Sequence, residues 1–366
     1  AAQPSAWEIP VTAASTGRKQ AGRLLIIISS LALAAAIIFQ CLHSFGALGA
    51  GFANWRPVLY VYVAWAVALC VGLVLTRGEA GHRAVFLLPA VLFTISMVVF
   101  PTVFGLYIAF TDWNLSSLNG RHFNGLANIR TLIHDSFFWN AMLNMVYYVL
   151  SVLVQYAIAF GLALLLNSNV RGRKFFRVSF LIPFMLSPVA VAFMIGQSMF
   201  NNRFGPAAML MRHLGWSHPN FFGTAWPARL SIMSIDAWYS IPFVMILLLA
   251  GLQSLPGEVL ESAKVDGANG WQSFWQMTFP LVLPVSVTAV VLRIIFELKL
   301  ADIVLTITGG GPGGATDTVS SFIFREYNDR SNVGYGTALA EFYLIVIIIF
   351  ITVLLSLASR WMRRVT

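Results

Sequence analysis

Charged residues are scarce in this chain. Only 10% of its 366 residues are Asp, Glu, Lys or Arg, and 58% are hydrophobic, whereas soluble domains carry about 25% charged residues. This shortage excludes an ordinary soluble globular protein. Apolar runs about 20 residues long recur along most of the sequence, and each can cross roughly 30 Å of hydrocarbon. The sequence therefore predicts one all-α membrane domain.

Residue types that carry catalysis are also few. The two cysteines, Cys41 and Cys70, are too few for a disulfide framework or a thiolate metal site. The histidines are dispersed without paired-ligand spacing, which gives metal catalysis no support. The glycines at 309–314 lack the Gly-Lys-Ser/Thr that ends a phosphate-binding loop. We expect no cofactor or metal in this chain, and no enzyme activity of its own.

The basic residues are spread along the chain. The net charge is +9, but Lys and Arg lie in short segments between apolar runs, without a basic tail or stripe. We therefore expect membrane lipid, and no nucleic acid, as a partner. Eight runs are predicted to be transmembrane helices, at about 24–43, 57–75, 85–110, 140–166, 178–200, 230–251, 282–304 and 337–358.

Eight spans place both termini on one side of the membrane. The segments on that side carry 13 basic residues and the opposite segments carry eight. By the positive-inside rule, both termini are predicted to be cytoplasmic. The first run resembles a signal peptide, but it is longer than the usual 7–15 residues, which favours an uncleaved helix.

The sequence divides into three parts. Residues 1–20, which contain Pro, Ser and Thr, are predicted to be a flexible cytoplasmic tail. Residues 21–80 are predicted to form two N-terminal transmembrane helices. Residues 81–366 are predicted to form a six-helix core with a cytoplasmic loop at 254–281.

That loop has the pattern of a helix, a turn and a second helix. Pro256 can start a helix, Glu258 and Glu261 favour its N-terminal end, and Gly267 can end it in a left-handed conformation. A second helical piece, 271–279, leads to Pro280.

The spacing of this loop resembles that of bacterial ABC importer permeases. Those proteins carry Glu-Ala-Ala, a Gly six residues after the Glu, and Ile-x-Leu-Pro starting sixteen after it. This chain has Glu261-Ser262-Ala263, then Gly267, then Met277-Thr278-Phe279-Pro280, with Ser262, Met277 and Phe279 as departures. The resemblance implies that an ATPase-coupling surface is formed by Glu261, Ser262, Ala263, Asp266, Gly267 and Pro280.

The resemblance extends over residues 85–366 to the sugar and polyol permeases related to the maltose system. It is carried by Phe110-Thr111-Asp112-Trp113, Phe138-Trp139-Asn140-Ala141, Ala250-Gly251-Leu252-Gln253-Ser254 and Thr308-Gly309-Gly310-Gly311-Pro312-Gly313. It implies the type I ABC importer permease fold in a bacterial cytoplasmic membrane. It also implies a second permease as heterodimer partner, two ATPase subunits that bind ATP and Mg, and a periplasmic or extracellular solute-binding protein.

The seventh apolar run contains four charged residues, Arg293, Glu297, Lys299 and Asp302. A charge at mid-bilayer costs about 2.5–3.5 kcal/mol, so each needs a partner or water. Their spacing lets Arg293 share a helix face with Glu297, and Lys299 with Asp302. All four are candidate substrate-pathway residues. In the maltose-type relatives, the stretch that matches Glu297 and Lys299 binds sugar, although neutral amides are typical there.

Other roles are open for these charges. Glu297 can form a structural salt bridge to the partner permease, and Lys299 can extend to the outer surface. The expected function is the membrane subunit of an ATP-driven importer for a sugar, polyol or related polar solute. A secondary transporter that uses intramembrane charges and a membrane-embedded enzyme are the alternatives. The solute stays open among glycerol phosphate, a sulfonated sugar and a neutral alditol.

Overall fold

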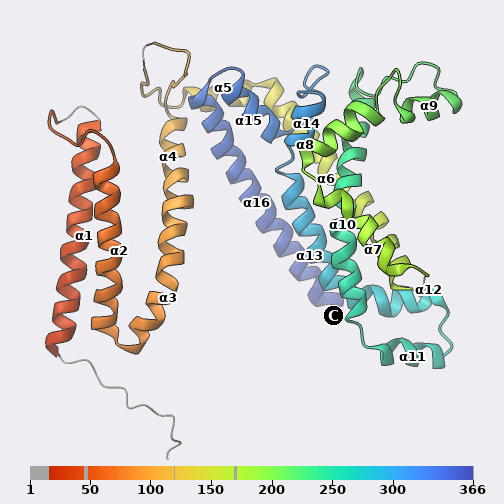
Figure 1. Cartoon of the computed structure of the whole chain (residues 1–366), viewed down its shortest axis with the longest axis horizontal. Coiled ribbons are helices and arrows are strands. Elements are labelled where there is room, and N and C mark those ends of the chain that lie inside the picture. Colours follow the sequence, from red (N-terminus) through yellow and green to blue (C-terminus); the bar gives the residue numbers. More distant parts are fainter. Residues whose placement is uncertain (1–15, 45–47, 119, 169–170, 366) are drawn as a thin grey trace, which may run out of the picture. The chain divides into compact units, whose positions relative to one another are not determined.

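The computed structural model describes residues 16–44, 48–118, 120–168 and 171–365. In these ranges the chain is helical, and the one β-type pairing is an isolated bridge between Thr111 and Phe123. The all-α prediction is confirmed. The elements, drawn in Figure 1, are α1 Thr16–Ser44, α2 Arg56–Arg77, α3 Glu79–Thr94, η1 Ile95–Val99, α4 Phe100–Ala109, α5 Ala127–His134, α6 Ser136–Asn167, α7 Arg173–Met185, α8 Pro188–Val191, η2 Ala192–Met199, α9 Pro206–His213, α10 Ala225–Gln253, α11 Gly257–Val265, α12 Gly270–Ser273, η3 Phe274–Thr278, α13 Phe279–Glu297, α14 Asp302–Ile307, α15 Val319–Asn328 and α16 Val333–Val365.

Seven stretches of the described chain are long and apolar enough to cross a membrane as single helices: Thr16–Ser44, Arg56–Arg77, Glu79–Ala109, Ser136–Asn167, Ala225–Gln253, Gly270–Glu297 and Val333–Met362. The predicted span at 178–200 is instead a bent pair, Arg173–Met185 and Pro188–Met199, with an angle of 98°. Pro188 has no N–H and disfavours the helical region for Ser187, which is extended at φ −67°, ψ 138°. The expected eight spans are reached if the bent pair counts as one.

The seventh predicted helix has different bounds in the structure. It was expected at 282–304, but the helical run starts at Gly270, passes through Pro280 and ends at Glu297. A new helix, α14, begins at Asp302. Pro280 therefore does not end the second helix of the loop. Lys299 lies in a break and Asp302 starts the next helix, so the predicted shared helix face of these two residues is wrong.

Side chains from other elements donate hydrogen bonds to backbone carbonyls at this break. Tyr343 Oη donates to the carbonyl of Leu298 at 2.8 Å, and Ser320 Oγ donates to the same oxygen at 3.2 Å. Thr318 Oγ1 donates to the carbonyl of Leu300. Irregular backbone in a membrane requires such partners, because lipid supplies none. The break is therefore stabilised by specific tertiary hydrogen bonds.

The chain forms two compact units, 1–104 and 105–366. In the first unit, α1 and α2 approach closely, since a Cβ on Gly22 would lie 2.9 Å from the carbonyl oxygen of Gly72. Helix α3 joins them, because Tyr62 Oη donates to the carbonyl of Leu92 at 2.9 Å. Cys41 and Cys70 are unpaired. Residues 16–20 of the predicted tail belong to α1, and residues 1–15 lie outside the described chain.

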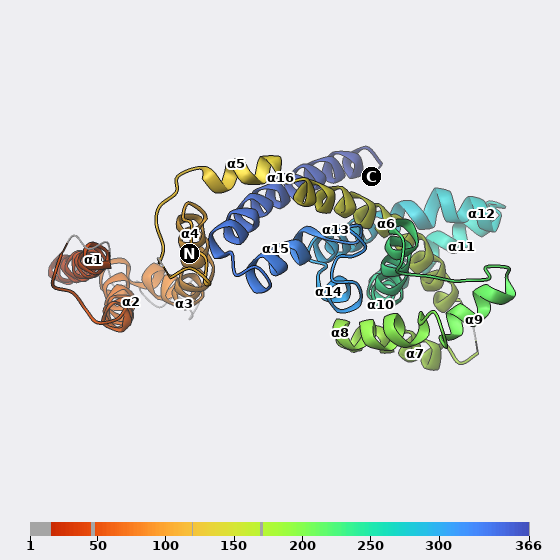
Figure 2. The same ribbon diagram turned by 90° about the horizontal axis from the view of Figure 1, so that it is seen from above.

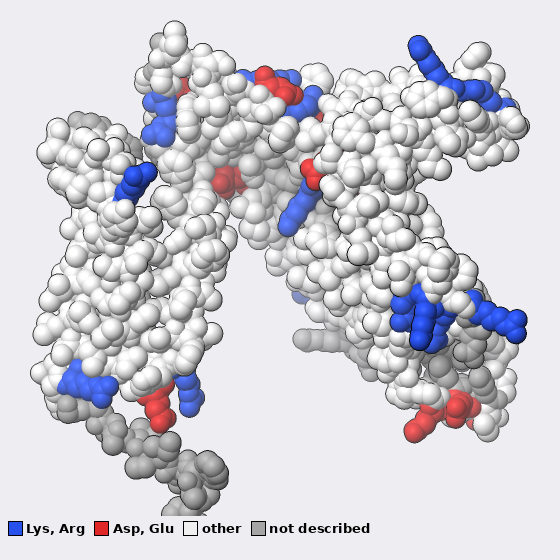
Figure 3. All heavy atoms as spheres, viewed as in Figure 1, with Lys and Arg blue, Asp and Glu red and all other residues white. Residues whose placement is uncertain are grey.

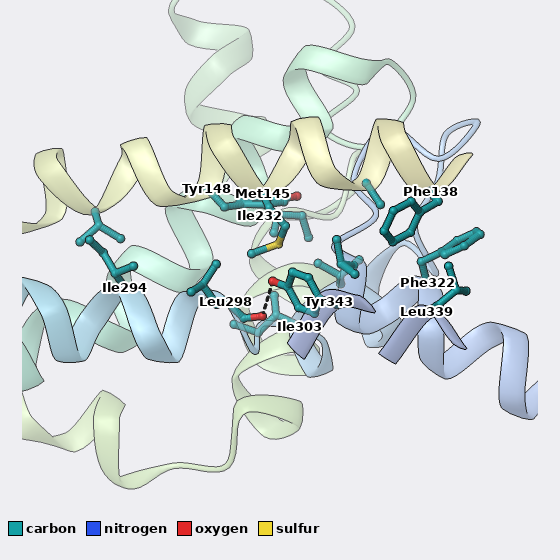
Figure 4. Packing of buried hydrophobic residues seen from close by; sticks show 14 of the residues in the cluster. Phe138, Met145, Tyr148, Ile232, Ile294, Leu298, Ile303, Phe322, Leu339 and Tyr343 are labelled. Atoms are coloured by element: carbon teal, nitrogen blue, oxygen red, sulfur yellow. Dashed lines mark hydrogen bonds between the residues drawn. The ribbon is translucent and has the colours of Figure 1, made fainter. Parts of the chain in front are cut away.

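The second unit packs around α6, α10 and α13. Figure 4 shows one buried cluster, in which Phe138, Met145 and Tyr148 of α6 face side chains of α10, α13 and α16. Seen from above, α13 and α14 lie between α16 on one side and α8 on the other (Figure 2). The glycine-rich turn after α14 is held on α6, where Asn144 Nδ2 donates to the carbonyls of Gly314 and Asp317 at 3.0 and 2.9 Å.

Candidate functional site

The loop between α10 and α13 is a helix, a turn and a second helix, as predicted. Helix α11 ends where Gly267 adopts a left-handed φ of 78° and the N–H of Ala268 bonds the carbonyl of Ala263 at 2.9 Å. The second helix opens with a capping box, in which Asn269 and Gln272 exchange hydrogen bonds of 2.9 Å. Both ends of the turn are therefore fixed by local sequence.

The loop presents mostly exposed side chains. Ala263 is buried at 2% exposure, Pro280 is half-buried, and Glu261, Ser262, Asp266 and Gly267 are exposed. Acidic atoms gather at this end of the second unit in Figure 3, over α11. Large apolar side chains stand beside them, since Val265 is 87% and Trp271 71% exposed. An acidic and apolar surface of this kind on a short rigid helix suits contact with another protein.

A buried ion cluster joins three membrane helices. Arg293 of α13 pairs with Glu297, one turn along, and with Asp236 of α10. Gln155 of α6 completes the cluster, because its Nε2 donates to Asp236 and its Oε1 accepts from Arg293 Nε, each at 2.9 Å. These side chains are at most 4% exposed. The cluster holds α6, α10 and α13 together and shields its charges from lipid.

A cavity of about 230 Å³ opens beside the break between α13 and α14. Arg293, Lys299 and Asp302 line it, together with Asp236 and Ser240 of α10. Its apolar walls are mostly aromatic, and come from α7, α10 and α13: Phe184, Tyr239, Phe243 and Phe296. A cavity with aromatic walls and a few converging polar groups is the usual form of a small-molecule site.

The structure brings together part of the predicted substrate-pathway set. Arg293, Lys299 and Asp302 share the cavity, whereas Glu297 lies behind it, 1% exposed, and is not a lining residue. Sequence reasoning missed Asp236 and Gln155. Asp236 could have been found, since it is the one acidic residue within the apolar run 230–251. In the described residues no group of three or more His, Cys, Asp or Glu is placed to hold a metal.

Helices that can cross a membrane, a cavity at a helix break and an exposed helical loop define an α-helical transport protein. Comparison with known proteins gives the family. Residues 155–366 match the family model described as "Binding-protein-dependent transport system inner membrane component". The chain belongs to this family and is a permease subunit of an ABC importer, a multi-pass protein of the inner membrane. Family membership argues against the secondary transporter and the membrane-embedded enzyme.

Named relatives cover most of the chain. It is 31% identical over 279 residues to the trehalose/maltose transport system permease protein MalF of Thermococcus litoralis, which covers 76% of this chain and 94% of that protein. It is 33% identical over 267 residues to the sulfoquinovosyl glycerol transport system permease protein SmoG of Agrobacterium fabrum, with 73% and 86% covered. A crystal structure of a bacterial ABC transporter for the acidic polysaccharide alginate has the same fold, with a TM-score of 0.64, 22% identity, and 85% of this chain and 99% of that chain covered.

Proposed function

We propose that this chain is one of two different permeases in an importer that moves a sugar, polyol or related polar solute into the cytoplasm. A solute-binding protein delivers the solute, and two ATPase subunits bind ATP and Mg and hydrolyse the ATP. This chain binds no cofactor. The names of the relatives support the solute class, since they are named for transport of neutral disaccharides and of a sulfonated glycoside.

The observation that carries the proposal is the direct connection of the exposed loop to both helices beside the cavity. Helix α11 follows α10 after a short turn, and α12 runs through η3 into α13. Asp236 of α10 and Arg293 of α13 pair across these two helices. Asp236 lies 17 residues before Gln253, or roughly 25 Å at 1.5 Å per residue. A movement of the loop is therefore carried along two joined helices to the cavity.

The coupling surface is assigned to Glu261, Ser262, Ala263, Asp266, Gly267 and Pro280. Exposed acidic side chains on α11 suit a basic cleft in the ATPase, whereas the methyl group of Ala263 is buried and contributes to packing. Residues 21–80 are assigned as two extra N-terminal spans, with the six-helix core at 81–366 and both termini in the cytoplasm. The cavity volume is below the 300–1,000 Å³ common for ligand sites, which fits a site completed by the second permease.

Purification of the tagged chain in mild detergent, followed by mass spectrometry, tests this function. The expected complex contains one copy of this chain, one second permease and two copies of a subunit with a phosphate-binding loop. Its ATPase activity should rise when solute-loaded binding protein is added. A chain that is recovered without any ATPase subunit, yet transports solute after reconstitution, would overturn the proposal.

A further inference from the structure

Two cationic side chains line the cavity, and one of them already pairs with carboxylates of the protein. Arg293 is 3% exposed at its side chain and pairs with two carboxylates, Asp236 and Glu297. Its charge is therefore neutralised within the fold. Lys299 is exposed, lines the same cavity and takes part in none of the ion pairs of the described chain. Lys299 is thus the cation that the cavity offers to a ligand.

The carboxylate of Asp302, which shares the cavity, does not neutralise Lys299. Asp302 is exposed and lines the cavity, but it too is in none of the ion pairs found among the described residues. Asp302 stands in the first turn of α14, where the helix dipole favours a negative charge. The cavity therefore presents a cation and an anion that are not paired with each other.

The aromatic wall of the cavity indicates which other groups the ligand carries. Phe184 stacks on Phe243 with ring centroids 5.2 Å apart, and Phe243 meets Phe296 edge-on at 5.4 Å. These rings form an apolar wall, which suits contact with the C–H face of a sugar ring. A ligand that satisfies the whole cavity has an apolar face, an anionic group and hydroxyl donors.

We propose that the solute is an acidic sugar or polyol derivative, whose carboxylate, sulfonate or phosphate group binds Lys299 while its hydroxyl groups donate to Asp302. This inference rests on the proposed function and narrows its solute class. A charge-assisted hydrogen bond forms at Lys299, and such bonds are shorter and about twice as strong as neutral ones. A neutral sugar offers the ammonium group hydroxyl acceptors but no countercharge, and an uncompensated charge is costly within a membrane.

The test uses the complete complex, with both permeases, the ATPase subunits and the binding protein, in proteoliposomes. Uptake is measured for an acidic panel of hexuronates, sugar phosphates and sulfonated hexosides, and for a neutral panel of hexoses, alditols and disaccharides. Wild type should transport a member of the acidic panel. The variant Lys299→Ala should lower its uptake efficiency about 10- to 150-fold, the loss expected for one charge-assisted hydrogen bond, and Lys299→Arg should retain most of it.

Arg203→Ala is the matched control, since it removes one exposed positive charge from the segment before α9, away from the cavity. It should leave uptake unchanged, and the yield of intact complex should be equal in all variants. Transport of neutral solutes alone, or acidic uptake that is unaffected in Lys299→Ala, overturns the inference and leaves the importer standing. If no solute of either panel raises ATPase activity or enters the vesicles, the proposed function itself fails.

Discussion

Tyr343 of α16 donates a hydrogen bond from its hydroxyl to the carbonyl oxygen of Leu298, 2.8 Å away, at the residue that directly follows α13 (Figure 4). Tyr343 is 6% exposed and Leu298 is 7% exposed, so water is largely kept from this bond. The position of the break beside the cavity therefore depends on a side chain 45 residues further along the chain.

Replacing this tyrosine tests the contribution of that bond. Tyr343→Phe should lower the free energy of unfolding by about 1 kcal/mol, since one buried hydrogen bond is lost while Ser320 still donates to the same carbonyl. Thermal unfolding in detergent measures the change. Tyr60→Phe, at a side chain that is 68% exposed in α2, is the control. Equal stability of the two variants would show that the bond does not hold the break.

The ion cluster should respond unequally to loss of its members. Arg293→Met leaves Asp236 and Glu297 without their cation, at a cost of about 3–5 kcal/mol, and should sharply reduce the yield of intact complex. Glu297→Gln leaves Arg293 paired one to one with Asp236 and should assemble nearly normally. Yields are compared by size-exclusion chromatography. Similar losses in both variants would contradict a cluster centred on Arg293.

The turn of the coupling loop should be sensitive to backbone conformation. Gly267→Pro should abolish solute-stimulated ATPase activity without affecting membrane insertion or pairing with the second permease, because proline cannot adopt the φ of 78°. Glu261→Lys should do the same by reversing a surface charge. Gly257→Ala is the control, at a glycine of ordinary φ with open space around it. Normal solute-stimulated ATPase activity in both loop variants would contradict the assignment of this loop as the ATPase-coupling surface.

The topology is tested by single cysteines in a chain whose Cys41 and Cys70 are replaced by Ala. Exposed positions on the predicted outer side, Leu118, Leu214 and Asn328, should react with an impermeant thiol reagent added to intact cells. Positions on the predicted inner side, Glu79, Gly172 and Ser262, should react only after the membrane is opened. Labelling of the inner set in intact cells would reverse the orientation and move the loop away from any ATPase.

Asp317, in the segment before α15, gives a pH dependence. Burial raises the pKa of this carboxyl above its ordinary value of 3.8, although the ion pair with Arg325 and the bond from Ser321 oppose the rise. The folded state thus favours the protonated form, so this group's stabilisation is present below pH 3.8 and is lost as the pH rises through the raised pKa. In thermal unfolding, wild type should lose stability relative to Asp317→Asn as the pH is raised over that window. A difference in stability between the two proteins that does not change with pH would contradict the raised pKa of Asp317 in the folded state.

Much of this fold follows from local sequence. Apolar length predicts the long helices, and Gly267 marks the end of α11 because few other residues tolerate its φ. The break at 298–301 has no such mark, since Leu298, Lys299, Leu300 and Ala301 include neither proline nor glycine. Its position is set by donors from α15, α16 and the segment before α15, which no local pattern reveals. The pairing of Arg293 with Asp236 was missed for the same reason, because the two residues are 57 positions apart in the sequence.

The bend between α7 and α8 bears on how the cavity can change shape. Phe184 lies before the bend and Pro188 after it, and both line the cavity. Among the described residues, no main-chain hydrogen bond crosses the Leu186–Ser187 peptide, since Leu186 bonds back to Pro183 and Val191 to Ser187. Turning one wall against the other therefore requires rotation about a few single bonds and leaves every helical hydrogen bond intact. The resistance to such a swing comes from side-chain packing and from side-chain hydrogen bonds such as the one from Gln197 Nε2 to the carbonyl of Thr306 at 3.4 Å.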